Sequence, residues 1–265
     1  MKAIVFLGGG RITGALAAGL RLAGYSRTIV AYDRHPEKLR ALRRESRIEI
    51  ARDLKSAVAR ADMLIVAVRP ASVKEAIAQV AACGTAAPRL CVSLAAGIPL
   101  TNLRAWHGPP VRWARAMPSP VCRIRRGLTP LSFDRGVSHG DRARVRKFFA
   151  LVGPVLDLPD RQMDAITATH SPTHGYHAVA TLAKAAQDAG LDRKTALIAA
   201  AHALSDGIFY WRRSGVRLDE LLHEAATPGG IAAATMAAMD KAGYTRVVAK
   251  GVKAGVARAR MNARR

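Results

Sequence analysis

Hydrophobic and polar positions follow two different patterns along the chain, and the change falls near residue 160. Before it, short β-branched runs alternate with longer stretches in which apolar residues recur every three to four positions. Such alternation builds βαβ units, so we expect an α/β domain with a parallel sheet covered by helices on both faces. The predicted strands are 2–7, 28–32, 62–68, 89–94, 110–117, 127–133 and 154–159, and the predicted helices include 11–24, 71–82 and 141–153.

After residue 160 the strand signals stop, and the chain becomes rich in alanine with helical spacing of its apolar residues. Each predicted segment opens at Ser, Thr, Asp or Pro or closes at Gly, as helices do. The segments are 175–190, 192–215, 217–227 and 231–243, followed by a final helix with a solvated basic face after Asp240. We therefore predict two domains, 1–160 with the sheet and 161–265 all-helical.

The composition indicates a folded protein of a reducing compartment. With 265 residues, half of them apolar, the chain can bury a sizeable core. The cysteines Cys83, Cys91 and Cys122 form neither a CxxC pair nor an even framework, which favours a cytoplasmic location. The apolar run at the N-terminus is too short for a signal peptide, and no uninterrupted run reaches the about 18 residues of a membrane span.

The net charge of +23 would attract nucleic acid, acidic surfaces or anionic metabolites. However, only 5% of the residues are aromatic, and the sequence has no zinc-finger or RNA-recognition signature. The basic residues are also spread along the chain except at its end. We expect a small anionic molecule, and not nucleic acid, as the main partner.

Gly8, Gly9 and Gly10 stand directly between the first predicted strand and an apolar-periodic helix. A dinucleotide's pyrophosphate needs this arrangement, because glycine lets the backbone approach the phosphates and the helix N-terminus offers free N–H groups. Read from Gly8, the third glycine of the GxGxxG fingerprint falls on Thr13, and Gly14 follows one place late. We predict a Rossmann-like dinucleotide-binding domain over 1–160, with the cofactor contacted by Gly8, Gly10, Arg11, Ile12 and Thr13.

The second strand ends in Asp33, which lies 19 residues after Gly14, close to the spacing of a carboxylate that binds the ribose 2′-hydroxyl. This favours NADH. Arg34, His35 and Lys38 follow at once and could instead hold the 2′-phosphate of NADPH, so both cofactors stay open. Asp33 is also a candidate helix cap.

Several motifs, in order along the chain, carry a resemblance to a known family. They are GGGRITGALAAGL (8–20), ADMLIVAVRP (61–70), SLAAGI (93–98), RAMPSP (115–120), GLT (127–129), MDAITA (163–168), DAGLDRKTALIAAAHAL (188–204) and TPGG (227–230). Through them the chain resembles pyrroline-5-carboxylate reductase over essentially its whole length. The resemblance implies an NAD(P)H-dependent oxidoreductase that reduces 1-pyrroline-5-carboxylate to proline. It also implies a C-terminal helical substrate and dimerisation domain, and a homodimer or a ring of dimers.

The same resemblance places the ends of two further strands along the cofactor, although these residues could instead serve only to pack the strand ends. Arg69 replaces the family's usual lysine, which keeps the charge and changes the donor geometry. Ser119 replaces an asparagine expected near the nicotinamide. The cofactor-binding residues implied here are Val68, Arg69, Pro70, Ala95 and Gly97.

The substrate half departs most from the family. Its Ser-Gly-Ser-Gly-Pro-Ala segment is here His-Ser-Pro-Thr-His-Gly (170–175), and Ala232 replaces a threonine expected near the imine nitrogen. We therefore expect a small anionic cyclic imine, or a carbonyl, as substrate. The substrate-binding residues implied by the resemblance are Ser171, Thr173, Tyr176, Gly229 and Gly230.

His170, His174 and His177 crowd around this departure. No acidic or cysteine partner lies near them in sequence, so we expect no metal site. Ser171 as N-cap and Pro172 as first helical residue predict a helix start, whose free N–H groups suit a carboxylate.

A histidine beside such a turn could add charge or donate a proton, and Thr227 before Pro228 is a similar predicted helix start. The catalytic candidates are His170, His174 and Thr227, each with the alternative of an ordinary helix-start residue.

Two other functions remain open. A related imine or β-hydroxyacid-type dehydrogenase would need a lysine as its acid, for which Lys184 is the candidate. A non-catalytic NAD(P)-binding regulator is compatible with Ala232 and with the high positive charge.

Overall fold

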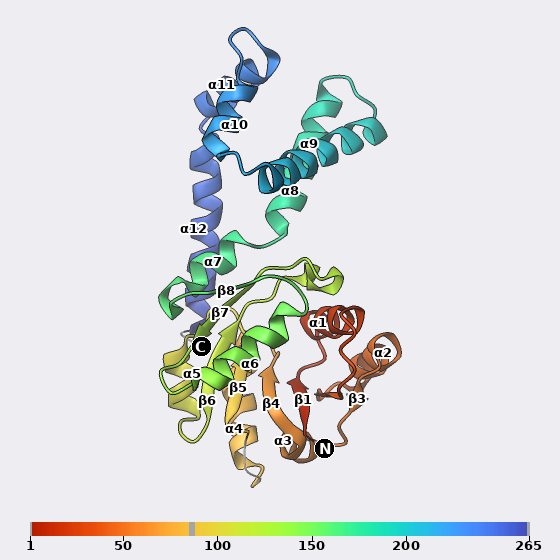
Figure 1. The fold of residues 1–265 in the computed structure, drawn as a ribbon, viewed down its shortest axis with the longest axis vertical. Helices are drawn as coiled ribbons and strands as arrows, with labels where there is room; N and C mark the ends of the chain where they lie inside the picture. Colours follow the sequence, from red (N-terminus) through yellow and green to blue (C-terminus); the bar gives the residue numbers. More distant parts are fainter. Residues whose placement is uncertain (1, 85–87, 264–265) are drawn as a thin grey trace. The chain divides into compact units, whose positions relative to one another are not determined.

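The computed structural model describes residues 2–84 and 88–263, and this part of the chain contains one sheet of eight strands (Figure 1). The strand order is β3-β2-β1-β4-β5-β6-β7-β8. The strands are β1 (Ala3–Leu7), β2 (Ile29–Tyr32), β3 (Glu49–Ile50), β4 (Ala61–Val66), β5 (Leu90–Ser93), β6 (Arg112–Ala116), β7 (Thr129–Phe133) and β8 (Val155–Asp157). The predicted α/β class is confirmed.

One strand pair departs from the parallel arrangement, since β7 runs antiparallel to β6 while β8 again runs parallel to β7. The segment between β6 and β7 holds a short 3₁₀ helix, η2 (Pro120–Ile124), and no crossover α-helix. A parallel pair needs such a crossover, so the chain turns back on itself here.

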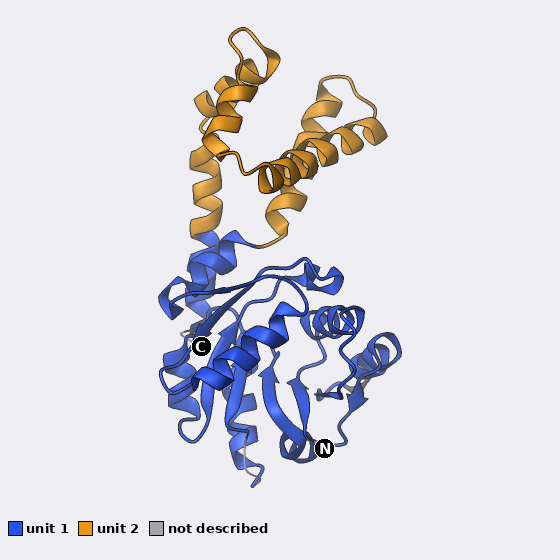
Figure 2. Cartoon of the chain, in the orientation of Figure 1, with its two compact units in different colours: residues 1–170, 254–265 blue, residues 171–253 orange. Residues whose placement is uncertain are grey.

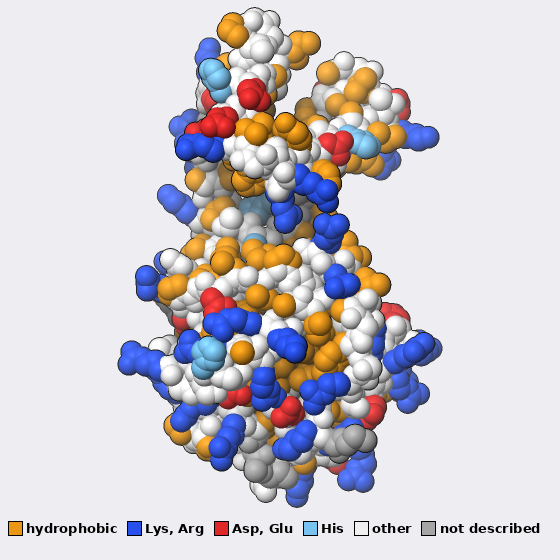
Figure 3. Space-filling view, in the orientation of Figure 1, with side chains coloured by type: hydrophobic (Ala, Val, Ile, Leu, Met, Phe, Trp, Pro, Cys, Tyr) orange, Lys and Arg blue, Asp and Glu red, His pale blue; other side chains and the backbone are white. Residues whose placement is uncertain are grey.

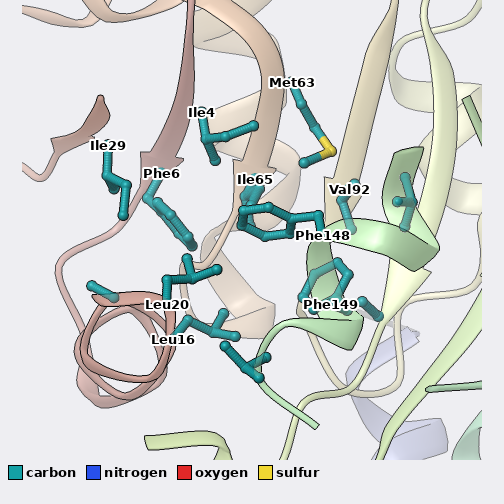
Figure 4. Close-up of a cluster of buried hydrophobic side chains, with 14 of the residues drawn as sticks. Ile4, Phe6, Leu16, Leu20, Ile29, Met63, Ile65, Val92, Phe148 and Phe149 are labelled. Atoms are coloured by element: carbon teal, nitrogen blue, oxygen red, sulfur yellow. The ribbon is translucent and has the colours of Figure 1, made fainter. Parts of the chain in front are cut away.

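Three helices cover one face of the sheet: α1 (Arg11–Leu22), α2 (Pro36–Ser46) and α6 (His139–Ala150). Figure 4 shows Ile4, Phe6 and Ile65 of the sheet against Leu16 and Leu20 of α1 and Phe148 and Phe149 of α6. Alternate residues of the same strands, such as Val5 and Leu7, face the other way.

That second face is covered by α3 (Leu54–Arg60), α4 (Val73–Ala82) and α5 (Leu100–Trp106). Nearly continuous burial of the central strands on both sides explains why they read as apolar runs in the sequence. The pattern missed α2, α3, α5 and β3, because these elements are short or strongly charged.

By contacts the chain divides into two compact units (Figure 2). Unit 1 comprises 1–170 and 254–265, and unit 2 comprises 171–253. Helix α12 (Tyr244–Ala263) begins in unit 2 and ends in unit 1. There Gly97 approaches the Ala259 carbonyl closely, and Asn262 Nδ2 donates to Ala96 O over 3.1 Å. The division into a dinucleotide-binding domain at 1–160 and a helical substrate and dimerisation domain at 161–265 remains a prediction.

Unit 2 consists of helices, as predicted. They are α8 (Thr173–Asp188), α9 (Arg193–Ser214), α10 (Leu218–Ala225), α11 (Ile231–Lys241) and the first part of α12. The longest, α9, begins after Asp192, whose carboxylate accepts from two backbone N–H groups, and ends at Gly215 in the left-handed region. Only Ala183, Ala196 and Ala200 of the 83 residues in unit 2 are buried.

The positive charge is concentrated in unit 1. This unit contains 32 of the 42 Lys and Arg residues and 12 of the 19 Asp and Glu residues, so it carries +20 of the total of +23. Figure 3 shows basic side chains scattered over the visible face of unit 1 without a single dense patch. Within residues 2–84 and 88–263, no helix combines the length and apolarity that a membrane crossing requires.

Candidate functional site

The candidate site lies at the carboxyl edge of the sheet, where the loops after β1, β4, β5 and β6 meet. Backbone hydrogen bonds hold these loops in register: Ala67 N donates to Leu7 O over 2.8 Å, and Leu94 N donates to Val66 O over 2.9 Å. Open α/β sheets bind their ligands at this edge.

The glycine loop has the geometry that a dinucleotide requires. Gly8 has φ +112°, and a Cβ on it would lie 2.7 Å from Ala67 O, so only glycine fits. Gly10 precedes α1, and a Cβ there would meet no atom within 4 Å. The free N–H groups of the first turn of α1, at Arg11, Ile12 and Thr13, therefore stand beside open space.

The displaced third glycine of the fingerprint has a structural explanation. Thr13 is fully buried, and its Oγ1 donates to Gly8 O over 2.7 Å, so the threonine closes the loop with its side chain. Gly14 faces α2, where a Cβ would lie 2.8 Å from Leu42 Cδ2. The glycine one place late thus lets α1 pack closely on α2.

Asp33, at the end of β2, binds the glycine loop. Its carboxylate accepts from Gly9 N over 2.7 Å and from His35 N over 2.9 Å. Arg34 is exposed, and its Nη1 lies 3.9 Å from Glu75 Oε1. Asp33 therefore orders the loop itself, and the exposed Arg34 is the cation beside it.

The other predicted cofactor residues lie along the same edge. Arg69 is exposed and precedes η1 (Pro70–Ser72), with Val68 half-buried beside it. Ala95 is buried, and its N–H donates to Ser93 Oγ over 3.3 Å. Gly97 has φ +80° and packs on Ala259, which explains the glycine without a cofactor.

A buried ion cluster, which the sequence reasoning missed, lies next to this edge. The Arg115 side chain on β6 is 2% exposed, and its Nη1 donates to Asp160 Oδ1 over 2.6 Å. Its Nη2 lies 3.6 Å from Asp164 Oδ1 on α7 (Met163–Thr169). The signal available was an arginine inside a buried strand. Ser119, two residues beyond Met117, is also buried, and its hydroxyl has no partner among the described residues.

His170 ends α7 and is half-buried. Its Nδ1 lies 2.7 Å from Ile166 O, and its Nε2 lies 2.9 Å from Met117 O. Both ring nitrogens therefore face backbone carbonyls.

The predicted helix start at Ser171 is off by one residue, since α8 begins at Thr173. Ser171 Oγ accepts from Thr173 N over 3.3 Å and donates to Thr173 Oγ1 over 3.0 Å. Pro172 has helical φ and ψ angles, and His174 N donates to Ser171 O over 3.2 Å. Tyr176, in the first turn, is 66% exposed.

The prediction of Thr227 as an N-cap is wrong. The segment 227–230 is a turn in which Thr227 O accepts from Gly230 N over 2.9 Å, and α11 begins only at Ile231. Pro228 followed by Gly229 at φ +76° is the sequence of a type II turn, which competes with a helix start.

Two further candidates concern metal and lysine chemistry. Among the described residues, no three His, Cys, Asp or Glu side chains gather as metal ligands would. Lys184 is exposed and pairs with Asp188 on its own helix, four residues on.

The sheet, the glycine loop and the helical unit define the class: a Rossmann-type dinucleotide-binding protein with a C-terminal helical domain. Residues 3–97 match the family model described as NADP oxidoreductase coenzyme F420-dependent, and 160–262 match pyrroline-5-carboxylate reductase dimerisation. A pyrroline-5-carboxylate reductase is 30% identical over 95% of this chain, and the chain therefore belongs to the pyrroline-5-carboxylate reductase family.

Two curated relatives cover nearly the whole chain. The pyrroline-5-carboxylate reductase of Pseudomonas aeruginosa is 30% identical over 95% of this chain and 93% of its own length. The pyrroline-5-carboxylate reductase of Mycobacterium tuberculosis is 29% identical over 97% of this chain and 96% of its own length.

Solved structures share the fold. The pyrroline carboxylate reductase of Plasmodium falciparum with NADP bound aligns with a TM-score of 0.87 and 18% identity, over 99% of this chain and 98% of that one. The pyrroline-5-carboxylate reductase of Coxiella burnetii aligns with a TM-score of 0.87 and 23% identity, over 98% of this chain and 97% of that one.

Proposed function

We propose that this protein is an NAD(P)H-dependent reductase of a small anionic cyclic imine, 1-pyrroline-5-carboxylate, which it converts to proline. The observation that carries the proposal is the 30% identity to a pyrroline-5-carboxylate reductase along 95% of the chain. The glycine loop supports it, because its shape suits a dinucleotide. We place the protein in the cytoplasm on the cysteine usage alone.

The proposed cofactor contacts follow from the carboxyl edge. Gly8 and Gly10 allow close approach, and the N–H groups of Arg11, Ile12 and Thr13 would bind the pyrophosphate. The bound nicotinamide would supply the hydride. After β2, the exposed Arg34 is suited to bind the 2′-phosphate of NADPH. The Asp33 carboxylate still has acceptor sites that could bind the ribose hydroxyl of NADH. Val68, Arg69, Pro70, Ala95 and Gly97 complete the proposed cofactor set.

The proposed substrate contacts lie in unit 2. The first turn of α8, after Ser171, carries the positive end of a helix dipole, which suits the carboxylate of an imino acid. Thr173, His174 and Tyr176 belong to this turn. Gly229 and Gly230 remain proposed binding residues on the family resemblance, with Thr227 as a hydroxyl donor.

We further propose a homodimer. Unit 2 buries too few side chains to be stable alone, and α9 exposes Ile208, Phe209, Tyr210 and Trp211 by 40–58%. A second copy packed on these faces would remove their apolar surface from water. Sedimentation at increasing protein concentration checks this, and a monomer at micromolar concentration would contradict it.

The test of the activity is cofactor oxidation, followed at 340 nm, with 1-pyrroline-5-carboxylate and a panel of other cyclic imino acids and β-keto acids. Turnover of pyrroline-5-carboxylate above the other compounds supports the proposal. Turnover of a keto acid alone would favour the dehydrogenase alternative. Tight NADPH binding without turnover of any compound would favour the regulator.

A further inference from the structure

His170 connects two parts of unit 1 that are distant in sequence. It is the last residue of this unit before the chain enters unit 2, and its ring lies between α7 and the loop that follows β6.

The contacts of the ring restrict its chemistry. The carbonyl oxygens of Ile166 and Met117 can only accept hydrogen bonds, so a ring nitrogen that carries a hydrogen donates it to the carbonyl that it faces. Neither nitrogen presents a lone pair or an N–H group to a substrate in this arrangement. The geometry does not suit a proton donor.

The contact with Met117 has a clear structural consequence. Met117 directly follows β6, and its N–H donates to Pro130 O over 3.0 Å, which ties one side of this residue to β7. On the other side, Nε2 of the His170 ring lies 2.9 Å from the Met117 carbonyl oxygen. The loop Met117–Ser119, at the edge that takes the dinucleotide, is thereby held between β7 and α7.

Ion pairs also connect β6 to α7, but the Met117 carbonyl is contacted by His170. Arg115 binds Asp160 and lies near Asp164, so the body of β6 is already attached to α7 and to the turn before it. Those ion pairs position the strand. They do not reach the peptide after Met117, which the histidine holds.

We infer that His170 is a positioning residue, which fixes the Met117–Ser119 backbone at the cofactor edge. The inference rests on the proposed reductase function. A misplacement of about 1 Å in groups that position a reaction can cost about a hundredfold in rate, so a displaced loop at this edge should lower kcat.

Three substitutions separate this role from the alternatives. The amide nitrogen of glutamine lies about where Nε2 of histidine lies, so His170→Gln keeps a donor toward Met117 O. In His170→Asn the amide nitrogen lies about where Nδ1 lies and reaches only Ile166 O. His170→Ala keeps neither donor. The exposed His139, on α6, provides the matched control His139→Gln.

We expect His170→Asn and His170→Ala to lose about tenfold to a hundredfold in kcat with less than about a threefold change in the KM for NADPH. His170→Gln and His139→Gln should stay within about threefold of the wild type in both constants. Equal loss in all three His170 variants would indicate a proton donor and overturn the inference. Wild-type values in all three would overturn it as well.

A readout independent of turnover is hydrogen exchange of the peptide that covers 112–124. Exchange should accelerate in His170→Asn and His170→Ala and remain unchanged in His170→Gln. Unchanged exchange in the asparagine and alanine variants refutes the inference even if the wild type reduces no imine. An inactive wild type with the expected exchange pattern would refute the proposed function alone.

Discussion

Replacing Gly97 by alanine tests how the end of α12 is attached to the sheet domain. Gly97 has φ +80°, and a Cβ on it would lie 2.0 Å from Ala259 O and 2.7 Å from its carbonyl carbon. Both are backbone atoms, so no side-chain rotation relieves the overlap. The helix end has to move by more than about 1 Å to reach ordinary van der Waals separation.

Two effects set the cost. A non-glycine residue at positive φ costs about 1–3 kcal/mol. Moving the helix end also breaks the hydrogen bonds from Asn262 Nδ2 to Ala96 O and from Asn102 Nδ2 to Ala263 O, both 3.1 Å, at about 0.5–1.5 kcal/mol each. Together the free energy of unfolding should fall by about 2–6 kcal/mol.

The assay is urea unfolding followed by tryptophan fluorescence in a Trp211→Phe background, so that the two remaining tryptophans, Trp106 and Trp113, both report on unit 1. Gly24→Ala is the control for strain, because Gly24 has φ +76° and a Cβ there meets no atom within 4 Å. Gly97→Ala should lower the unfolding midpoint clearly more than Gly24→Ala. Equal midpoints would refute the argument, because strain alone would then explain the whole effect.

Three further substitutions and probes test other parts of the chain. Arg115→Leu should lower the free energy of unfolding by about 3 kcal/mol, since it leaves the partly buried Asp160 carboxylate without its cation; Asp160→Asn in the same background should restore part of the loss in thermal melts. Burial raises the pKa of the Cys122 thiol to about 12, so a thiol reagent at pH 7 should label the more accessible Cys83 well before Cys122, and mass spectrometry of the labelled peptides will show the order. The hydrogen bonds from Thr195 to the carboxylate that caps α9 lower the pKa of Asp192. The contribution of this carboxylate to stability is therefore present above about pH 4 and is lost as the pH falls. Asp192→Asn should make the melting temperature less dependent on pH on the acid side, and an unchanged profile would contradict this.

The sequence was sufficient for the sheet domain because its strands are buried on both faces and read as apolar runs. The glycine loop was predictable because only glycine fits at position 8, beside Ala67 O. The helices of unit 2 were predictable from their caps, as Asp192 and Gly215 illustrate.

The rest depended on contacts between distant residues. Nothing local in the sequence shows that Asp33 accepts from Gly9, or that the ring of His170 meets Met117 O, 53 residues earlier. Thr227 failed as a helix start because Pro228 and Gly229 suit a turn equally well, and only the structure selects between the two. The pairing of Arg115 with Asp160 was likewise outside the reach of spacing arguments.

The return of α12 to the sheet domain makes unit 2 a long insertion between Ser171 and Lys253. The ribosome therefore finishes the helical unit before it releases the segment that packs against Gly97. Unit 1 can reach its full set of contacts only after residues 254–263 have left the exit tunnel. Truncations in this segment should therefore damage a domain whose other 170 residues were synthesised long before.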